Sequence, residues 1–181
     1  MLIYLALSTL AVLTAALCLL ALAVLPLPAA IHGVFAVGVL PLIVGVISHF
    51  LPVLTRSGQA PRGILLAPPL LQVCGGLTVL HFLGQIDDRL LGLTALSAMS
   101  IVGVFAGWTI RRAGHTLGRP HPCWQWYLAA LLCLLLALAL IPAMERWPAA
   151  HTALRRLHIH LNSLGFVGLT ALGTLQVLLP T

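Results

Sequence analysis

Six long apolar runs alternate with short stretches that contain proline, glycine and charged residues. A helix needs roughly 20 apolar residues to cross the ~30 Å hydrocarbon core of a bilayer, and each run supplies about that number. The pattern predicts an all-α integral membrane bundle of six transmembrane helices, with residues 1–181 forming a single transmembrane domain. The runs cover residues 2–25, 31–54, 64–84, 90–110, 124–143 and 157–179.

Breaks are expected at residues 26–28, 55–62, 85–89, 111–122 and 143–156, where proline, glycine and charge concentrate. The first run has no basic start and is longer than the apolar core of a signal peptide. We therefore interpret it as a spanning helix that stays in the protein.

Composition supports a lipid environment. Hydrophobic residues make up 61% of the chain and charged residues 7%, and the mean hydropathy is +1.12. A soluble domain of this length has too little interior to bury so much apolar surface, so the lipid bilayer is the expected partner. The formal charge of +6 reflects scarce acids. Because no basic stripe with interleaved aromatics is present, nucleic-acid binding is excluded.

Six spans place both termini on one side of the membrane. The loops after the second and fourth runs carry five arginines, and the opposite loops carry four arginines together with all three acids. Positively charged loops favour the cytoplasm, so this slight bias predicts cytoplasmic termini in a bacterial inner membrane. The five arginines are Arg56, Arg62, Arg111, Arg112 and Arg119.

Four of the eight histidines lie at the ends of apolar runs. His32 opens the second run, His81 closes the third, and His158 and His160 open the sixth. Adjacent spans run antiparallel, so all four are expected at one depth, near the predicted outer face. Ionisable side chains are costly in a membrane and usually functional. The other four, interpreted as solvated or interfacial, are His49, His115, His121 and His151.

Neutral imidazole binds heme iron, copper and zinc. His158 and His160 are two residues apart, so on a regular helix they point about 200° from each other. They cannot both chelate one small ion, but they can face two large cofactors on opposite sides of the helix. Glycines follow both His32 and His160; small residues let membrane helices pack closely and also leave room for a flat macrocycle.

Two segments go further than composition. Residues 31–52 read I-H-G-V-F-A-V-G-V-L-P-L-I-V-G-V-I-S-H-F-L-P, and residues 158–180 read H-I-H-L-N-S-L-G-F-V-G-L-T-A-L-G-T-L-Q-V-L-L-P. The first resembles the second helix of the catalytic subunit of heme–copper oxidases. The second resembles that family's H-x-H helix, especially in the C-type oxidases. The resemblance implies that His32 and His160 are axial ligands of a low-spin heme b and that His158 faces a second, high-spin heme.

Arg155 and Arg156 directly precede the H-x-H motif. A guanidinium matches a carboxylate geometrically, so these residues are candidates to pair with heme propionates. The alternative is that both are solvated loop arginines.

The chain also departs from that family. The oxidase subunit has about twice as many helices, and the copper-ligand helices with their paired H-H have no counterpart here. Oxygen reduction coupled to proton pumping by this chain alone is therefore disfavoured. His81 could complete a bis-histidine site with His158, bind copper, or leave an open site for a small gas. A homodimer would restore twelve helices.

The expected function is that of a b-type cytochrome with one or two hemes near the outer face, exchanging electrons with quinol or a periplasmic carrier. The alternative is a nitric oxide- or oxygen-reactive heme or heme–copper protein acting as reductase, sensor or protective factor. A third hypothesis is a cofactor-free membrane protein that serves assembly or transport. Whether the protein is an enzyme stays open at this point.

Overall fold

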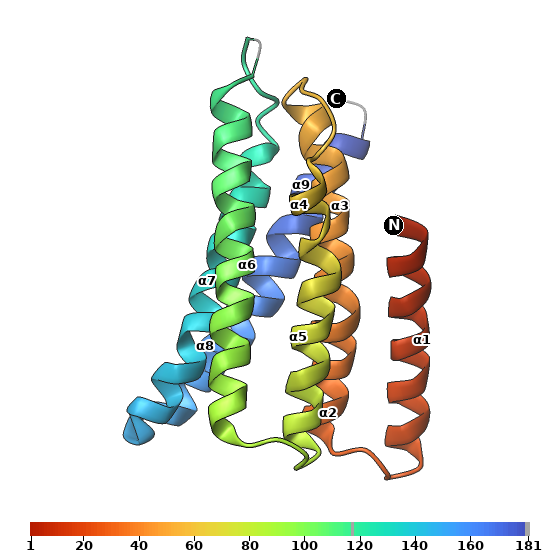
Figure 1. The fold of residues 1–181 in the computed structure, drawn as a ribbon, viewed down its shortest axis with the longest axis vertical. Coiled ribbons are helices and arrows are strands. Elements are labelled where there is room, and N and C mark those ends of the chain that lie inside the picture. Colours follow the sequence, from red (N-terminus) through yellow and green to blue (C-terminus); the bar gives the residue numbers. More distant parts are fainter. Residues whose placement is uncertain (117, 180–181) are drawn as a thin grey trace.

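The computed structural model describes residues 1–116 and 118–179, which form an antiparallel bundle of six membrane-length helices (Figure 1). Within those residues the regular structure is helical and no strand occurs. The predicted all-α membrane bundle is confirmed. The spans cover Leu2–Ala21, Leu27–Leu54, Arg62–Phe82, Asp88–Gly114, Trp124–Arg146 and Pro148–Leu178.

Three of the spans are each one continuous α-helix, and the other three are each made of several helical segments. The simple ones are α1 (Leu2–Ala21), α6 (Asp88–Gly114) and α7 (Trp124–Arg146). The second span joins α2 (Leu27–His32), the π-helix η1 (Gly33–Val39) and α3 (Leu40–Leu54). The third joins α4 (Arg62–Leu65) and α5 (Ala67–Phe82). The sixth joins the 3₁₀ turn η2 (Pro148–Ala150), α8 (His151–His160), the π-helix η3 (Leu161–Gly168) and α9 (Leu169–Leu178).

Two of the expected breaks differ from those observed. The break expected at 26–28 lies earlier, at residues 22–26, because α1 already ends at Ala21 and the second span begins at Leu27. Pro28 stands in the first turn of that span, where the missing N–H of proline costs nothing. The break at 143–156 contracts to Trp147, since α7 continues past Pro142 and helix resumes at Pro148. His151, expected in a loop, is the first residue of α8 and is exposed.

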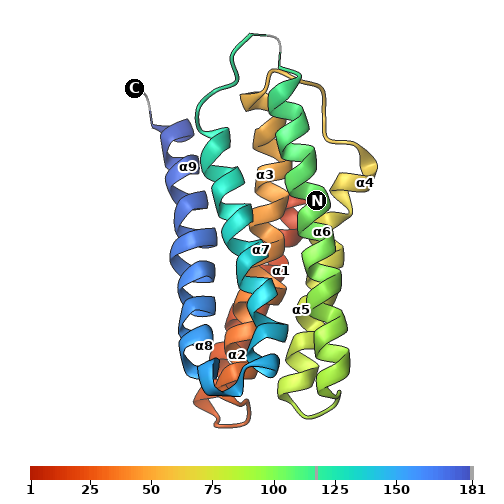
Figure 2. The same cartoon turned by 90° about the vertical axis from the view of Figure 1, so that its left-hand side faces the viewer.

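The helices pack as a chain of neighbours. α1 packs on the second span, which packs on α5; α5 packs on α6, α6 on α7, and α7 on the sixth span (Figure 2). A common core forms where α3, α6, α7 and η3 meet, around Ile47, Phe105, Tyr127 and Phe166. Leucines on the outer face of α1 remain exposed, as a lipid-facing helix requires.

The second and sixth spans share a feature that the sequence analysis missed. Each changes from α-helix to π-helix directly after a histidine, His32 in one and His160 in the other. Each histidine is followed thirteen residues later by a glycine, Gly45 or Gly173, and twenty residues later by a proline. π segments are rare and often mark functional sites. The two spans therefore share the same spacing of histidine, π segment, glycine and proline.

Polar side chains from both neighbours reach the backbone of η1. The Gln72 amide of α5 donates to the Val37 carbonyl at 3.2 Å and to the Ser8 hydroxyl at 2.5 Å. The Thr9 hydroxyl of α1 lies 3.0 Å from the Gly38 carbonyl and 2.8 Å from that of Leu5. Water is absent from the hydrocarbon core, so such groups must find partners within the protein. These contacts tie α1 and α5 to the π segment.

Gly75 of α5 lets that helix approach η1 closely. A Cβ at this position would overlap the backbone of Ala36 and Val37. The two backbones are so close that only glycine fits at this position. Small residues commonly allow membrane helices to approach in this way. The chain that follows His32 is thus held on both sides, by hydrogen bonds and by close packing.

Replacing Thr9 with valine should lower the free energy of unfolding by about 0.6–1.7 kcal/mol, the range found for interhelical hydrogen bonds in membranes. Valine keeps the shape and removes the hydroxyl that reaches Gly38 across the interface. Thr14→Val is the matched control, because the Thr14 hydroxyl bonds only the Leu10 carbonyl of its own helix. Equilibrium unfolding in mixed micelles measures both. Equal losses in the two variants would contradict a role for the cross-helix bond.

Candidate functional site

The four histidines singled out by the sequence lie at one end of the bundle, called here the histidine end. His32 is near the start of the second span, His81 near the end of α5, and His158 and His160 at the end of α8 that leads into η3. Figure 1 shows α2, the last turns of α5 and α8 together at this end of the molecule.

His32 is half-buried and held on two sides. Its Nδ1 lies 2.8 Å from the Pro28 carbonyl, one helical turn earlier. Its ring stacks on Phe82 of α5, with ring centroids 4.5 Å apart and an interplanar angle of 30°. The carbonyl and the aromatic ring together fix the plane of the imidazole.

His158 is half-buried against α7. Its Nδ1 lies 2.9 Å from the Ala137 carbonyl. Its Nε2 lies 3.3 Å from the Asn162 amide nitrogen, and the same amide donates to the His158 carbonyl at 2.8 Å. Asn162 sits one turn further along the sixth span. It was not singled out from the sequence, although its spacing of four residues from His158 is the signal that could have found it.

The two hydrogen bonds to carbonyls have a chemical consequence. A carbonyl can only accept, so Nδ1 of His32 and of His158 must carry the proton, and the lone pair of each ring is on Nε2. Proteins orient histidine metal ligands in this way, with one ring nitrogen donating to a carbonyl and the other free for the metal. Both rings have the electronic form of an Nε2 ligand.

His81 is anchored to the turn between α5 and α6. Its Nδ1 lies 3.3 Å from the Ile86 carbonyl, and its Nε2 lies 3.7 Å from the Asp88 carboxylate. The ring also meets Phe82 edge-on, with centroids 5.2 Å apart. Because the Asp88 side chain is 84% exposed, the charge pair itself adds little stability.

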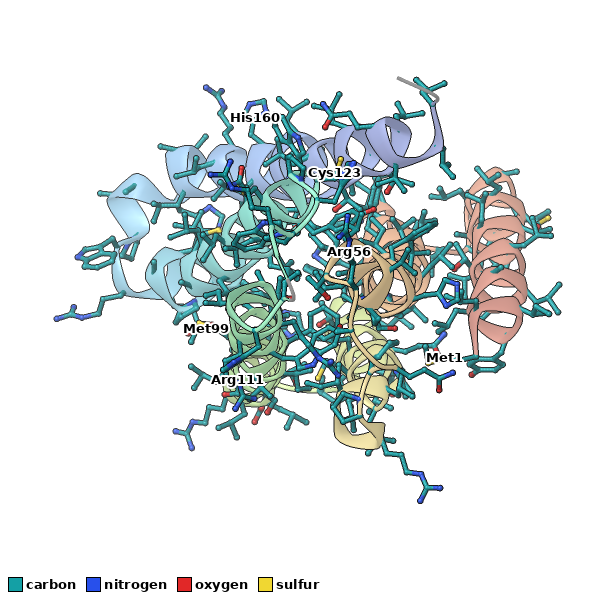
Figure 3. The ribbon with its side chains drawn as sticks, turned by 90° about the horizontal axis from the view of Figure 1, so that it is seen from above. Met1, Arg56, Met99, Arg111, Cys123 and His160 are labelled. Carbon is teal, nitrogen blue, oxygen red and sulfur yellow. The ribbon has the colours of Figure 1, made fainter. Side chains whose placement is uncertain are left out.

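Three of the four histidines, His32, His81 and His158, are half-buried at the histidine end. His160 is exposed and lies on the outer side of the sixth span, away from α3 and α5 (Figure 3). The two histidines of the H-x-H motif therefore point to different sides of their helix, as their spacing predicts, and His158 is the one that packs against α7.

Arg155 and Arg156 lie one turn before the H-x-H motif, on α8, and both are exposed. Within residues 1–116 and 118–179 neither forms a salt bridge. Their guanidinium groups are thus accessible at the histidine end.

The space around the histidines sets a limit on what can bind. A cavity of about 50 Å³ between the second to fifth spans is lined in part by Thr78, one turn before His81. Pockets that enclose drug-sized ligands measure roughly 300–1,000 Å³, so this cavity does not hold a porphyrin. The glycines after His32 and His160 are mostly in helix contacts: Gly38 meets Thr9, and Gly165 meets Cys133.

The ligand set itself suits a heme iron. A porphyrin supplies four nitrogens, so its iron takes only one or two protein ligands. In the described part of the chain, histidine, cysteine and carboxylate side chains do not gather in threes around a possible metal position.

Compared with known proteins, the chain matches no family model, no curated protein and no solved structure.

The hydrogen bonds to Pro28 and Ala137 predict that the neutral rings of His32 and His158 are protonated on Nδ1 in the heme-free protein. Nitrogen-15 spectra of histidine-labelled protein distinguish the two tautomers directly, and His32→Gln and His158→Gln assign the signals. His160 is the comparison, because its exposed ring is free to exchange between tautomers. A proton on Nε2 at either inner position would contradict the geometry.

Proposed function

We propose that this protein is a membrane b-type cytochrome that binds heme at its histidine end by bis-histidine ligation and transfers electrons. The observation that carries the proposal is the pair His32 and His158. Both rings are oriented by a backbone carbonyl with the lone pair on Nε2, and they belong to two different spans at the same end of the bundle. This is the arrangement by which proteins prepare imidazole ligands.

His32 is the constant member of the axial pair. The resemblance to heme–copper oxidases implies His160 as the opposite ligand, whereas the partial burial and the oriented ring of His158 favour His158. Two axial imidazoles leave no open position on the iron, so the heme would carry electrons without binding a substrate. Quinol or a periplasmic carrier is the proposed redox partner. Arg155 and Arg156, exposed beside the site, are the candidate contacts for heme propionates.

Replacing His32 with alanine should abolish the sharp low-spin bands in the reduced-minus-oxidised spectrum, because one axial ligand of the iron is lost. His158→Ala should have the same effect if the inner pair holds the heme, and His160→Ala should have it if the outer histidine does. Pyridine-hemochrome analysis then gives the heme content per chain for each variant.

His49→Ala is the matched control, since His49 is an exposed histidine near the opposite end of the second span. It should keep full heme content and an unchanged spectrum. Purified wild-type protein without sharp b-type bands would overturn the proposal.

One observation favours the alternative, a heme that reacts with nitric oxide or oxygen. Nε2 of His158 faces the Asn162 amide, and Nε2 of His81 faces Asp88, so His32 is the inner histidine whose Nε2 has no such contact within the described residues. If these contacts persist in the loaded protein, the iron is five-coordinate and has an open position for a small gas.

Adding carbon monoxide to the reduced protein separates the two functions. A bis-histidine heme should give an unchanged spectrum, because both axial positions are filled. A large shift of the Soret band would mean an open position and would replace the cytochrome proposal with the gas-reactive one. In that case Asn162→Leu should reduce the shift, because it frees Nε2 of His158 to occupy the open position.

A further inference from the structure

The opposite end of the bundle carries Arg56, Arg62, Arg111, Arg112 and Arg119 and is called here the arginine end. Toward this end an open groove of about 230 Å³ runs between the third span and α6. Gly63, Ala67 and Leu70 line one side, and Ser100, Ile101 and Val104 line the other. The groove is nearly all apolar, and the Ser100 hydroxyl is turned to the Leu96 carbonyl of its own helix.

Three arginines surround the outer end of this groove. Arg62 precedes Gly63 directly, and Arg111 lies two turns beyond Val104 on the same helix face, about 10 Å further along the axis. Arg112 is fixed in place: it donates to the Gln59 carbonyl at 3.0 Å and lies over the Trp108 ring at 5.7 Å. Figure 3 shows Arg111 at the edge of α6.

The charges here are uncompensated. All acidic residues of the chain, Asp87, Asp88 and Glu145, lie at or near the far ends of their helices. In α6 the separation between Asp88 and Arg111 amounts to about 35 Å of helix. Among residues 1–116 and 118–179, no aspartate or glutamate lies at the arginine end to neutralise this positive charge.

Tryptophans place this end at the membrane surface. Trp108, Trp124 and Trp126 all lie here, and tryptophan gathers at the level of the lipid headgroups. The Trp108 indole N–H is buried and has no hydrogen-bond partner within the described residues. The apolar groove thus lies at acyl-chain depth, and the arginines lie at phosphate depth.

We propose that the groove between the third span and α6 is a binding site for an anionic phospholipid. One acyl chain lies along Ala67 and Ser100, and the phosphate is bound by Arg62, Arg111 and Arg112. The volume of about 230 Å³ suits part of a hydrocarbon chain and is smaller than the pockets of ring-shaped ligands. Basic pockets between membrane helices recognise anionic headgroups in this way. The proposal is independent of the heme site at the other end.

The test measures lipid binding to the purified, delipidated full-length protein by native mass spectrometry. Phosphatidylglycerol and phosphatidylcholine with identical acyl chains are compared, so only the headgroup charge differs. Phosphatidylglycerol should bind roughly tenfold more tightly or better, given the contribution of each arginine near an anionic headgroup. Equal binding of the two lipids would overturn the proposal.

Two pairs of variants locate the site. Arg62→Gln with Arg111→Gln should remove the preference for phosphatidylglycerol, whereas Arg89→Gln with Arg146→Gln at the histidine end should keep it. All four arginines are exposed, so folding is not at risk. Ser100→Phe should fill the groove and abolish tight binding. Its control is Ser97→Phe, because Ser97 is equally exposed and bonds its own helix but does not line the groove.

Loss of the preference in the histidine-end variants, or in Ser97→Phe as much as in Ser100→Phe, would overturn the location. A third arm adds a neutral isoprenoid quinone. Displacement of phosphatidylglycerol by that quinone, with an affinity unaffected by Arg62→Gln and Arg111→Gln, would mean that the groove is a quinone site and would overturn the lipid assignment.

Discussion

The structure depends on one constraint: inside a bilayer, a polar group must find its partner within the protein. Thr9 and Gln72 satisfy it by reaching the carbonyls of the π segment η1 from two neighbouring helices. His32 and His158 satisfy it by donating from Nδ1 to the carbonyls of Pro28 and Ala137. The same bonds that make these histidines tolerable in the membrane also leave the lone pair on Nε2. The same hydrogen bonds therefore satisfy the Nδ1 groups inside the membrane and orient each ring as a possible metal ligand.

The two ends of the bundle carry different chemistry. At the histidine end, imidazoles, Phe82 and Asn162 form a site suited to an iron ligand, and the acids of the chain lie nearby. At the arginine end, arginines lie near an apolar groove, and the described residues place no aspartate or glutamate beside them. Long, largely apolar helices separate the two ends, so the charged groups of one end do not contact those of the other. The proposed heme and the proposed lipid thus depend on different residues.

Much of the fold could be predicted from the chain alone. Six spans followed from hydrophobicity, and the order of the spans placed four histidines at one end. The errors were local: Pro28 and Pro148 were taken as breaks, although a proline in the first turn of a helix is compatible with it. The π segments after His32 and His160 were not predicted. In η1 the carbonyls of the π segment accept hydrogen bonds from Gln72 and Thr9, which come from other helices. The resemblance to heme–copper oxidases stays a prediction.

The sequence by itself determined the solvent, the number of spans and the depth of each histidine, because apolar length and alternating direction are properties of the chain. It also determined that His158 and His160 point apart, since that follows from helical pitch. Only the tertiary structure decided which of them is half-buried, because that depends on how the sixth span is rotated against α7. The rotation is set by close contacts such as Gly165 with Cys133 and by the bond from His158 to Ala137. Packing between helices therefore determines that His158, and not His160, is half-buried, and no single segment of the sequence encodes that packing.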